Sequence, residues 1–447
     1  MGIDQGTHSP HVLRKIVHAG SQNTSFASGS ENLRVLAGLT VSTKQVERLS
    51  RNIGQECVER RESQVRAFLE LPLMERVAAD PHCPDLAVVS MDGGRLQIRD
   101  RPAPAFDSSD AGTRQGSATL CSPEPLPSKG MGQSEAVGEG DDDDAERHRH
   151  GHWREDKIGL LMTMTSTVSS RDPCPKIPET FVNPLTIPKL AREIKRGVAA
   201  GEDGVTDPVE DDPASPLEGC GEYTAAKVRL KSMVGTRAES KHFGEILAAA
   251  AFARGFFGAK RKAFVADGAA VNWTTQQRWF SDFTPILDLI HALSYVFSAA
   301  NAARGFRQGW ESYQRWITLV WAGQVSVVIE ELKQRQDDLG KPEAGDSKTS
   351  ARQVVADALR YLENNRSRMR YDEYRRQGLP IVSSHVESTV KRFNRRVKGT
   401  EKFWSESGAE ALLQLRADYL SETEPMERYW QEREAGATGR RIYRRPA

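Results

Sequence analysis

Three short runs of apolar residues predict buried β-strands. They cover residues 86–92, 157–164 and 262–267, and Val, Leu, Ile, Met and Ala fill most of their positions. Apolar, β-branched runs of this length are typical of strands. The first and third runs each end at an acidic residue, Asp92 or Asp267, that glycine follows. We therefore expect two carboxylates at strand ends, although apolar residues beyond the first pair of glycines leave open a continuation of that strand.

The first 80 residues are predicted to be helical. Apolar spacing indicates one helix that ends near Gly38 and a second over residues 43–61. A helix, a short turn and a second helix form the outline of a helix-turn-helix, which binds DNA through its second helix. The polar side of the second helix carries Lys44, Arg48 and Arg51. Any two-helix hairpin with a basic face has this pattern, so a purely structural hairpin stays open.

Most of the second half of the chain is also predicted to be helical. Residues 239–257 form an Ala-rich helix, another begins near Thr274, and helical periodicity continues to about Arg376. Four aromatic residues in this block are expected in the core rather than as platforms for nucleic-acid bases: Trp310, Tyr313, Trp316 and Trp321. Strands followed by helices and then an all-helical block predict a mixed α/β fold interrupted by insertions.

Residues 101–152 have the composition of a disordered acidic insertion. Pro, Ser, Gly and Asp dominate this segment, and four consecutive aspartates begin at Asp141. Three alternating histidines at its end could chelate a metal. No further ligands follow at zinc spacing, so a solvated charge run is the preferred interpretation of His148, His150 and His152.

Composition and charge narrow the class of protein. The 447 residues are 28% charged, and no apolar run has the roughly eighteen residues that a membrane span needs. The N-terminus lacks a signal-peptide pattern, and the five cysteines form no Cys-x-x-Cys pair. We expect a cytoplasmic protein without a membrane partner.

The net charge of +1 is built from blocks of opposite sign. Residues 366–398 contain ten Lys or Arg against three acidic residues, a local net charge of +7. The segment around residues 135–146 is strongly acidic instead. A basic block of this size favours binding to a polyanion.

Asp92 and Asp267 are the first candidates for chemistry. Carboxylates at the ends of neighbouring strands can converge, and carboxylates are the ligands that Mg²⁺ prefers. Two such ions about 3.5–4 Å apart can stabilise both the attacking and the leaving oxygen of a phosphoryl displacement. The structural alternative is that each aspartate forms a turn, because Asp-Gly is a common turn dipeptide.

Three further residues have both a functional and a structural interpretation. Glu387 lies at the start of a basic helix and could complete a metal site, but Ser384 and Glu387 also have the spacing of a helix capping box. Asp288 and His291 are three residues apart, so the aspartate could fix the tautomer of the imidazole. A histidine beside apolar residues is more often a satisfied core residue. Beyond Glu387, four cations could follow DNA phosphates: Lys391, Arg392, Arg395 and Arg396.

These motifs, in this order, resemble bacterial insertion-sequence transposases of the DDE type, specifically the ISKra-type family. The matching segments are Ser-Met-Asp-Gly-Gly-Arg around Asp92, Val-Ala-Asp-Gly-Ala around Asp267, Asp-x-x-His at 288–291 and Pro-Ile-Val-Ser-Ser-His-Val-Glu ending at Glu387. Residues 154–159 and 398–404 match as well, so the resemblance covers roughly 30–100 and 153–420.

The resemblance implies a fold, a site and an activity. It implies an RNase H-like core with an all-α insertion, in which Asp92, Asp267 and Glu387 bind two Mg²⁺ ions, replaceable by Mn²⁺, and Asp288 and His291 support the site. The implied reaction is cleavage at the terminal inverted repeats of the element, then attack of the freed 3′-hydroxyl on target DNA. A homodimer or larger oligomer on DNA and a location at the bacterial nucleoid are implied too.

The expected organisation follows from these motifs. Residues 1–80 form the DNA-binding region; 84–100, 153–285 and 380–425 form the catalytic core; 286–379 form the helical insertion; and 426–447 form a basic tail. Ser383-Ser384-His385 replaces the glycine-containing stretch of the family, and the zinc ribbon of longer members is missing. Two alternatives remain open, an RNase H-like endonuclease without strand transfer and a catalytically inactive, domesticated DNA-binding protein.

Overall fold

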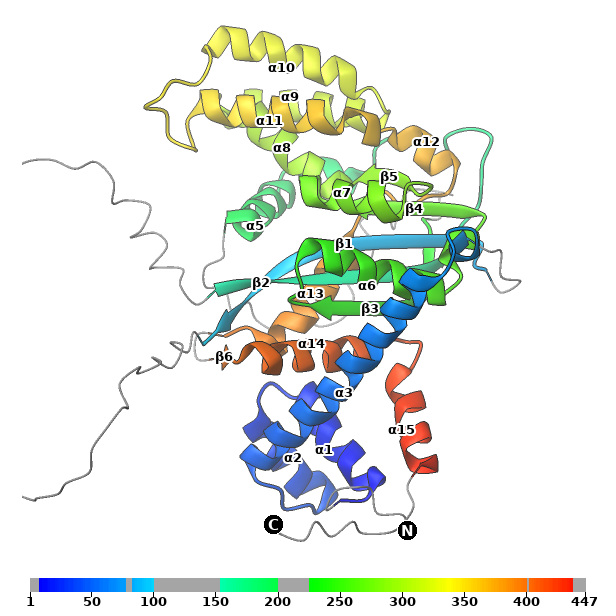
Figure 1. Cartoon of the computed structure of the whole chain (residues 1–447). Coiled ribbons are helices and arrows are strands. Elements are labelled where there is room, and N and C mark those ends of the chain that lie inside the picture. The colour runs from blue at the N-terminus through cyan, green and yellow to red at the C-terminus, as the bar shows by residue number, and fades with distance from the viewer. Residues whose placement is uncertain (1–7, 78–82, 100–152, 200–224, 400–401, 437–447) are drawn as a thin grey trace, which may run out of the picture.

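The chain folds into a mixed α/β structure around one six-stranded sheet. The computed structural model describes residues 8–77, 83–99, 153–199, 225–399 and 402–436. Figure 1 shows the sheet in the middle, a block of helices above it and the N-terminal helices below it. None of the helices within the described ranges combines the length and apolar composition of a membrane span.

The sheet has the order β3-β2-β1-β4-β5, and β6 pairs with the end of β1. β2 is antiparallel to both β1 and β3, whereas β4 is parallel to both β1 and β5. The strands are β1 (Leu86–Ile98), β2 (Trp153–Thr165), β3 (Lys227–Thr236), β4 (Arg261–Ala266), β5 (Thr284–Leu287) and β6 (Phe403–Trp404).

The three predicted strands are confirmed, with one correction. β1 does not end at Asp92 but continues to Ile98, because Gly93 and Gly94 keep their pairing with β2. Asp92 therefore lies inside a strand, and the prediction that it ends one is wrong. The sequence analysis also missed β3, whose first half alternates basic residues with apolar ones at the edge of the sheet.

Opposite faces of the sheet are covered by α6 (Ser240–Ala253) and α13 (Ser384–Val397). Two glycines on neighbouring strands show the two sides. A Cβ on Gly159 of β2 would meet Leu247 of α6, whereas a Cβ on Gly235 of β3 would meet Phe393 of α13. Side chains alternate along a strand, and Asp92 pairs with Ile158, one residue from Gly159. Asp92 consequently points to the face that α13 covers.

The upper block in Figure 1 consists of the helices between β5 and Arg376 together with two helices from earlier in the chain, and it shares its core with the sheet. Tyr313, Trp316 and Trp321 are buried and Trp310 packs against them, as expected of core residues. The buried Arg375 stacks 4.0 Å from the Trp321 ring centre. The helices here are α5 (Ile187–Ala199), α7 (Ala270–Trp279), α8 (Leu289–Asn301), α9 (Phe306–Trp321), α10 (Val325–Leu339), α11 (Ala351–Asn365) and α12 (Tyr371–Arg376).

The lower block contains the predicted helical hairpin. α2 ends before Gly38, which adopts a left-handed conformation (φ 63°), and α3 starts after its N-cap Ser42. α3 is longer than expected and runs up to pack on α6 and α14. The helices are α1 (Pro10–Gln22), α2 (Phe26–Ala37), α3 (Thr43–Glu70), α14 (Glu406–Leu420) and α15 (Pro425–Ala435).

The C-terminal part differs from the expected organisation within the described residues. The expected basic tail begins instead as the packed helix α15, in which Met426 and Trp430 are buried. Residues 437–447 lie outside the described ranges. The acidic segment 101–152, with His148, His150 and His152, also lies outside them.

Gly54 provides a test of the contact between α3 and α14 within the lower block. A Cβ on Gly54 of α3 would lie 2.5 Å from the carbonyl oxygen of Ala411. Alanine favours a helix by about 1 kcal/mol over glycine, but overpacking costs about 1–3 kcal/mol. We expect Gly54→Ala to lower the free energy of unfolding measured with urea. Gly345→Ala, with no atom within 4 Å of the new methyl group, is the control; an unchanged or higher value for Gly54→Ala would contradict this packing.

Candidate active site

The sequence-predicted carboxylates converge at one edge of the sheet. β1, β4 and β5 are parallel neighbours, so their carboxyl-terminal ends point the same way. The last ladder pair between β1 and β4 is Ser90 with Val265, and Asp92 and Asp267 each lie two residues beyond it. Asp288 directly follows β5. Asp92 and Asp267, which are 175 residues apart in sequence, therefore lie on neighbouring strands, close enough for the charge of Asp267 to act on Asp92.

Asp267 is held in a fixed turn. One of its carboxylate oxygens, Oδ1, accepts hydrogen bonds from the amide of Ala269 (3.0 Å) and the side chain of Asn272 (2.6 Å). The hydroxyl of Tyr361, from α11 in the upper block, donates to the Asp267 carbonyl at 2.6 Å. Tyr361 itself stacks on Tyr295 with ring centres 3.8 Å apart. The upper block thus fixes the backbone of Asp267. The second carboxylate oxygen, Oδ2, has no hydrogen-bond partner among the described residues.

The surroundings of Asp92 disfavour the ionised form of its carboxyl group. Burial and the neighbouring charge of Asp267 raise the pKa of Asp92 to about 6. The amide of Gly93, which donates to Oδ1 at 2.7 Å, and the charge of His291 act in the opposite direction. A partly buried carboxylate beside another one is stabilised by a cation placed between them. The turn-forming interpretation of Asp267 describes its local bonds but leaves this convergence unexplained.

Glu387 does not form the capping box that its spacing predicts. The N-cap residue of α13 is Ser383, and no side-chain hydrogen bond caps this helix. Burial and the charges of Asp288 and Asp92 raise the pKa of Glu387 to about 7, opposed by His291 and Lys391. The capping-box interpretation of Glu387 is therefore wrong, and its carboxylate lies beside Asp288 and His291 instead.

Asp288 and His291 form a buried pair across a strand-to-helix junction. Asp288 is completely buried, and its Oδ2 accepts from His291 Nδ1 at 2.6 Å. Although burial opposes protonation, the hydrogen bond to Asp288 and the charges around it raise the pKa of His291 to about 9. The other oxygen of Asp288 accepts from the amide of Ser383 at 2.9 Å. This bond ties the start of α13, and with it Glu387, to the sheet edge.

Only one group of three potential metal ligands is close-packed within the described residues. Ligand atoms of Asp288, His291 and Glu387 lie within 4.8 Å of one another. The predicted set of Asp92, Asp267 and Glu387 is not gathered that tightly, although Glu387 and Asp92 are near enough for their charges to interact. Glu387 thus stands between two possible partners, the His291 pair and the two strand carboxylates.

The predicted DNA-contacting cations divide into exposed and buried ones. Arg396 is buried: its guanidinium donates to the carbonyl of Gly20 and stacks on Phe26 and Trp404. It holds α13 to the lower block, so the prediction that Arg396 contacts a DNA phosphate is wrong. The other six are exposed, and within the described ranges none has an ion-pair partner: Lys44, Arg48, Arg51, Lys391, Arg392 and Arg395.

Asp156 of β2 is a site residue that the sequence analysis did not single out. It is fully buried, and burial together with the charge of Asp92 raises its pKa to about 7. It pairs with Gly94 on the same face as Asp92. Asp156 stands among Arg154, Glu155 and Lys157 at the polar start of β2, so nothing in the local pattern distinguished it.

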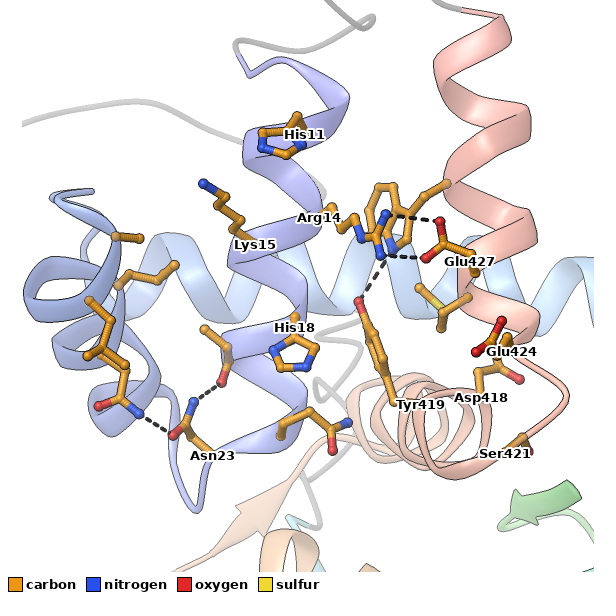
Figure 2. Close-up of a pocket in the computed structure, with 18 residues that line it drawn as sticks. His11, Arg14, Lys15, His18, Asn23, Asp418, Tyr419, Ser421, Glu424 and Glu427 are labelled. Atoms are coloured by element: carbon orange, nitrogen blue, oxygen red, sulfur yellow. Dashed lines mark hydrogen bonds and ion pairs between the residues drawn. The ribbon is translucent and has the colours of Figure 1, made fainter. Parts of the chain in front are cut away.

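A separate cavity of about 710 Å³ lies in the lower block, between α1, α2 and the α14–α15 corner (Figure 2). His11, Lys15 and His18 line one side, and an ion pair between Arg14 and Glu427 crosses it. None of the residues that line it belongs to the carboxylate cluster. The cavity therefore contributes nothing to the candidate active site.

Comparison with known proteins adds no assignment. No protein-family model matches the chain, and no curated protein is significantly similar to it.

The raised pKa values predict how stability depends on pH in the absence of divalent cations. The folded-state pKa of Asp92, Glu387 and His291 lies above the ordinary values of 3.8, 4.5 and 6.5. Groups with raised pKa bind more protons when folded, so stability is fully present below the ordinary pKa and is lost as pH rises through the folded one. We expect the free energy of unfolding to fall by about 1–3 kcal/mol between pH 4 and pH 9.

The matched variant is Glu387→Gln, which removes one titrating group. Its urea-denaturation profile should be flatter than that of the wild type between pH 4.5 and pH 7. Asp337→Asn, an exposed residue of α10 without a partner among the described residues, should leave the profile as it is. Stability that rises over this range in the wild type would contradict the arrangement of charges.

Proposed function

We propose that this protein is a metal-dependent DNA transposase that cleaves a DNA strand and joins the 3′-hydroxyl to target DNA. The observation that carries the proposal is that Asp92 and Asp267 lie at the carboxyl-terminal end of the parallel ladder between two neighbouring strands, with Glu387 of α13 near enough for its charge and that of Asp92 to interact. Carboxylates gathered in this way bind divalent cations for phosphoryl transfer. The DNA element that it moves would be an insertion sequence of the ISKra type, because the motifs resemble transposases of that family.

The sheet supports an RNase H-like core within this proposal. Three antiparallel strands, β3, β2 and β1, are followed by two strands parallel to β1. The first acid comes from the central strand and the second from the end of its parallel neighbour. The third comes from α13, which covers the same face to which Asp92 points.

The carboxylates of Asp92, Asp267 and Glu387 are suitable ligands for two Mg²⁺ ions, because each has an oxygen that is free to bind a cation. Asp92 and Asp267 each use Oδ1 for local hydrogen bonds and keep Oδ2 free, and the carboxylate of Glu387 has no hydrogen-bond partner among the described residues. Cations would relieve the repulsion that raises the pKa of Asp92 and Glu387. When bound, Mg²⁺ would activate the attacking water or hydroxyl and stabilise charge on the scissile phosphate.

The protein's own groups would then orient the site and the DNA. Asp288 holds His291 and the amide of Ser383, and so fixes the start of α13 above the sheet edge. Glu387, Lys391 and Arg395 follow at intervals of four residues and lie along one stripe of the helix. A DNA backbone that passes the carboxylates would meet these cations next. The exposed cations of α3 would contact DNA farther from the site.

Isosteric variants of the three acids test the proposed chemistry. Asp92→Asn, Asp267→Asn or Glu387→Gln should reduce Mg²⁺-dependent strand cleavage by at least about a hundredfold, because each removes a cation ligand. Binding to the same DNA, measured without divalent cations, should stay close to that of the wild type. Asp337→Asn is the control. Any of the three variants that cleaves at the wild-type rate would overturn the proposed site.

The same assay separates the alternatives. A pre-cleaved DNA end with a free 3′-hydroxyl should be joined to target DNA if the protein is a transposase. Cleavage without joining would identify an endonuclease, and DNA binding without turnover in Mg²⁺ or Mn²⁺ would identify an inactive DNA-binding protein.

Replacing the exposed cations of α13 tests DNA contact. Lys391→Ala, Arg392→Ala and Arg395→Ala combined should weaken DNA binding at low salt. They should also reduce the slope of log affinity against log salt concentration by up to about 2.7, since each lost phosphate contact is worth about 0.9. Lys341→Ala with Lys348→Ala, both exposed in the α10–α11 connection, should leave the slope unchanged. A wild-type slope in the triple variant would remove α13 from the DNA-binding surface.

A further inference from the structure

Asp156 is the buried acid for which the proposed chemistry leaves no role. Its side chain is completely inaccessible, and neither carboxylate oxygen has a hydrogen-bond partner among the residues that the structure describes. A buried carboxylate without donors destabilises the folded protein. A structural role is therefore a poor explanation for an acid at this position.

The position of Asp156 links it to Asp92. The register pairs Asp92 with Ile158 and Gly94 with Asp156, so both acids point to the face under α13, on adjacent strands. The charge of Asp92 acts on Asp156. Lys398 is the cation whose charge favours the ionised form of Asp156, but it makes no ion pair with it and lies over the Trp153 ring, 5.6 Å from its centre.

The absence of a side chain at Gly94 leaves room for the carboxylate of Asp156. A Cβ at residue 94 would lie 2.8 and 2.9 Å from the two oxygens of Asp156. Any side chain there would push the carboxylate away from the strand that carries Asp92. The glycine opposite Asp156 thus keeps a negatively charged group over β1, two residues from the first acid of the site.

We propose that Asp156 is a further cation-binding residue, a fourth carboxylate that extends the site on the side of Asp92 away from Asp267. The inference rests on the proposed function, since it assumes divalent cations at Asp92. It adds a ligand from β2, a strand that the predicted set does not use. A cation there would supply the positive partner that both oxygens of Asp156 lack within the described ranges.

The test is Mn²⁺ binding to Asp156→Asn, measured from the electron paramagnetic resonance signal of free Mn²⁺. The amide keeps the shape and removes the charge, so we expect the dissociation constant to rise about tenfold or more. Without cations at pH 8, the variant should unfold at the same temperature as the wild type or at a higher one. Asp337→Asn should bind Mn²⁺ as the wild type does.

The outcomes separate this inference from the proposed function. Weaker Mn²⁺ binding in both Asp92→Asn and Asp156→Asn supports both. Weaker binding in Asp92→Asn with Asp156→Asn within about threefold of the wild type overturns the role of Asp156 alone. Wild-type binding in both variants overturns the two proposals together. Should Asp156→Asn fail to fold, Gly94→Ala displaces the same carboxylate, and unchanged Mn²⁺ binding in it would overturn the inference.

Discussion

The gathering of partly or fully buried carboxylates at one end of the parallel strands is the constraint on which the rest of the structure depends. Asp92, Asp156 and Glu387 all have raised pKa values, and burial is the largest cause for each. A fold that gathers these acids loses stability, and mutual charge makes the loss larger. Protonation of the acids relieves this loss, and so would a cation bound between them. The divalent cations of the proposed function would have this second effect.

The surrounding structure keeps the acids in place despite this repulsion. Tyr361 of the upper block holds the backbone of Asp267, and Asp288 connects the sheet edge to α13 through Ser383. Arg396 holds the other end of α13 to the lower block through the Gly20 carbonyl. The site therefore lies where three parts of the chain meet. A change in any of them would alter the relative positions of Asp92, Asp267 and Glu387.

The sequence predicts the parts that depend on local pattern and misses those that depend on tertiary contact. The apolar runs located β1, β2 and β4, and Asp-Gly after an apolar run located two of the acids. The end of β1 was wrong because Gly93 and Gly94 read as a break, although the ladder to β2 continues through them. β3 was not predicted because Lys227, Arg229 and Lys231 interrupt its apolar residues. A strand at the edge of the sheet can carry such charged residues. Arg396 and Lys391 look alike in sequence, and only packing against Gly20 separates the buried one from the exposed one.

The central claim is that Asp92, Asp267 and Glu387 together bind divalent cations. The most direct measurement is a crystal structure of the wild-type protein grown with Mn²⁺, in which anomalous scattering locates the ions. The account predicts anomalous density between Asp92 and Asp267, with Glu387 turned from His291 toward it. Density confined to Asp288, His291 and Glu387, or none near Asp92 at saturating Mn²⁺, would contradict it.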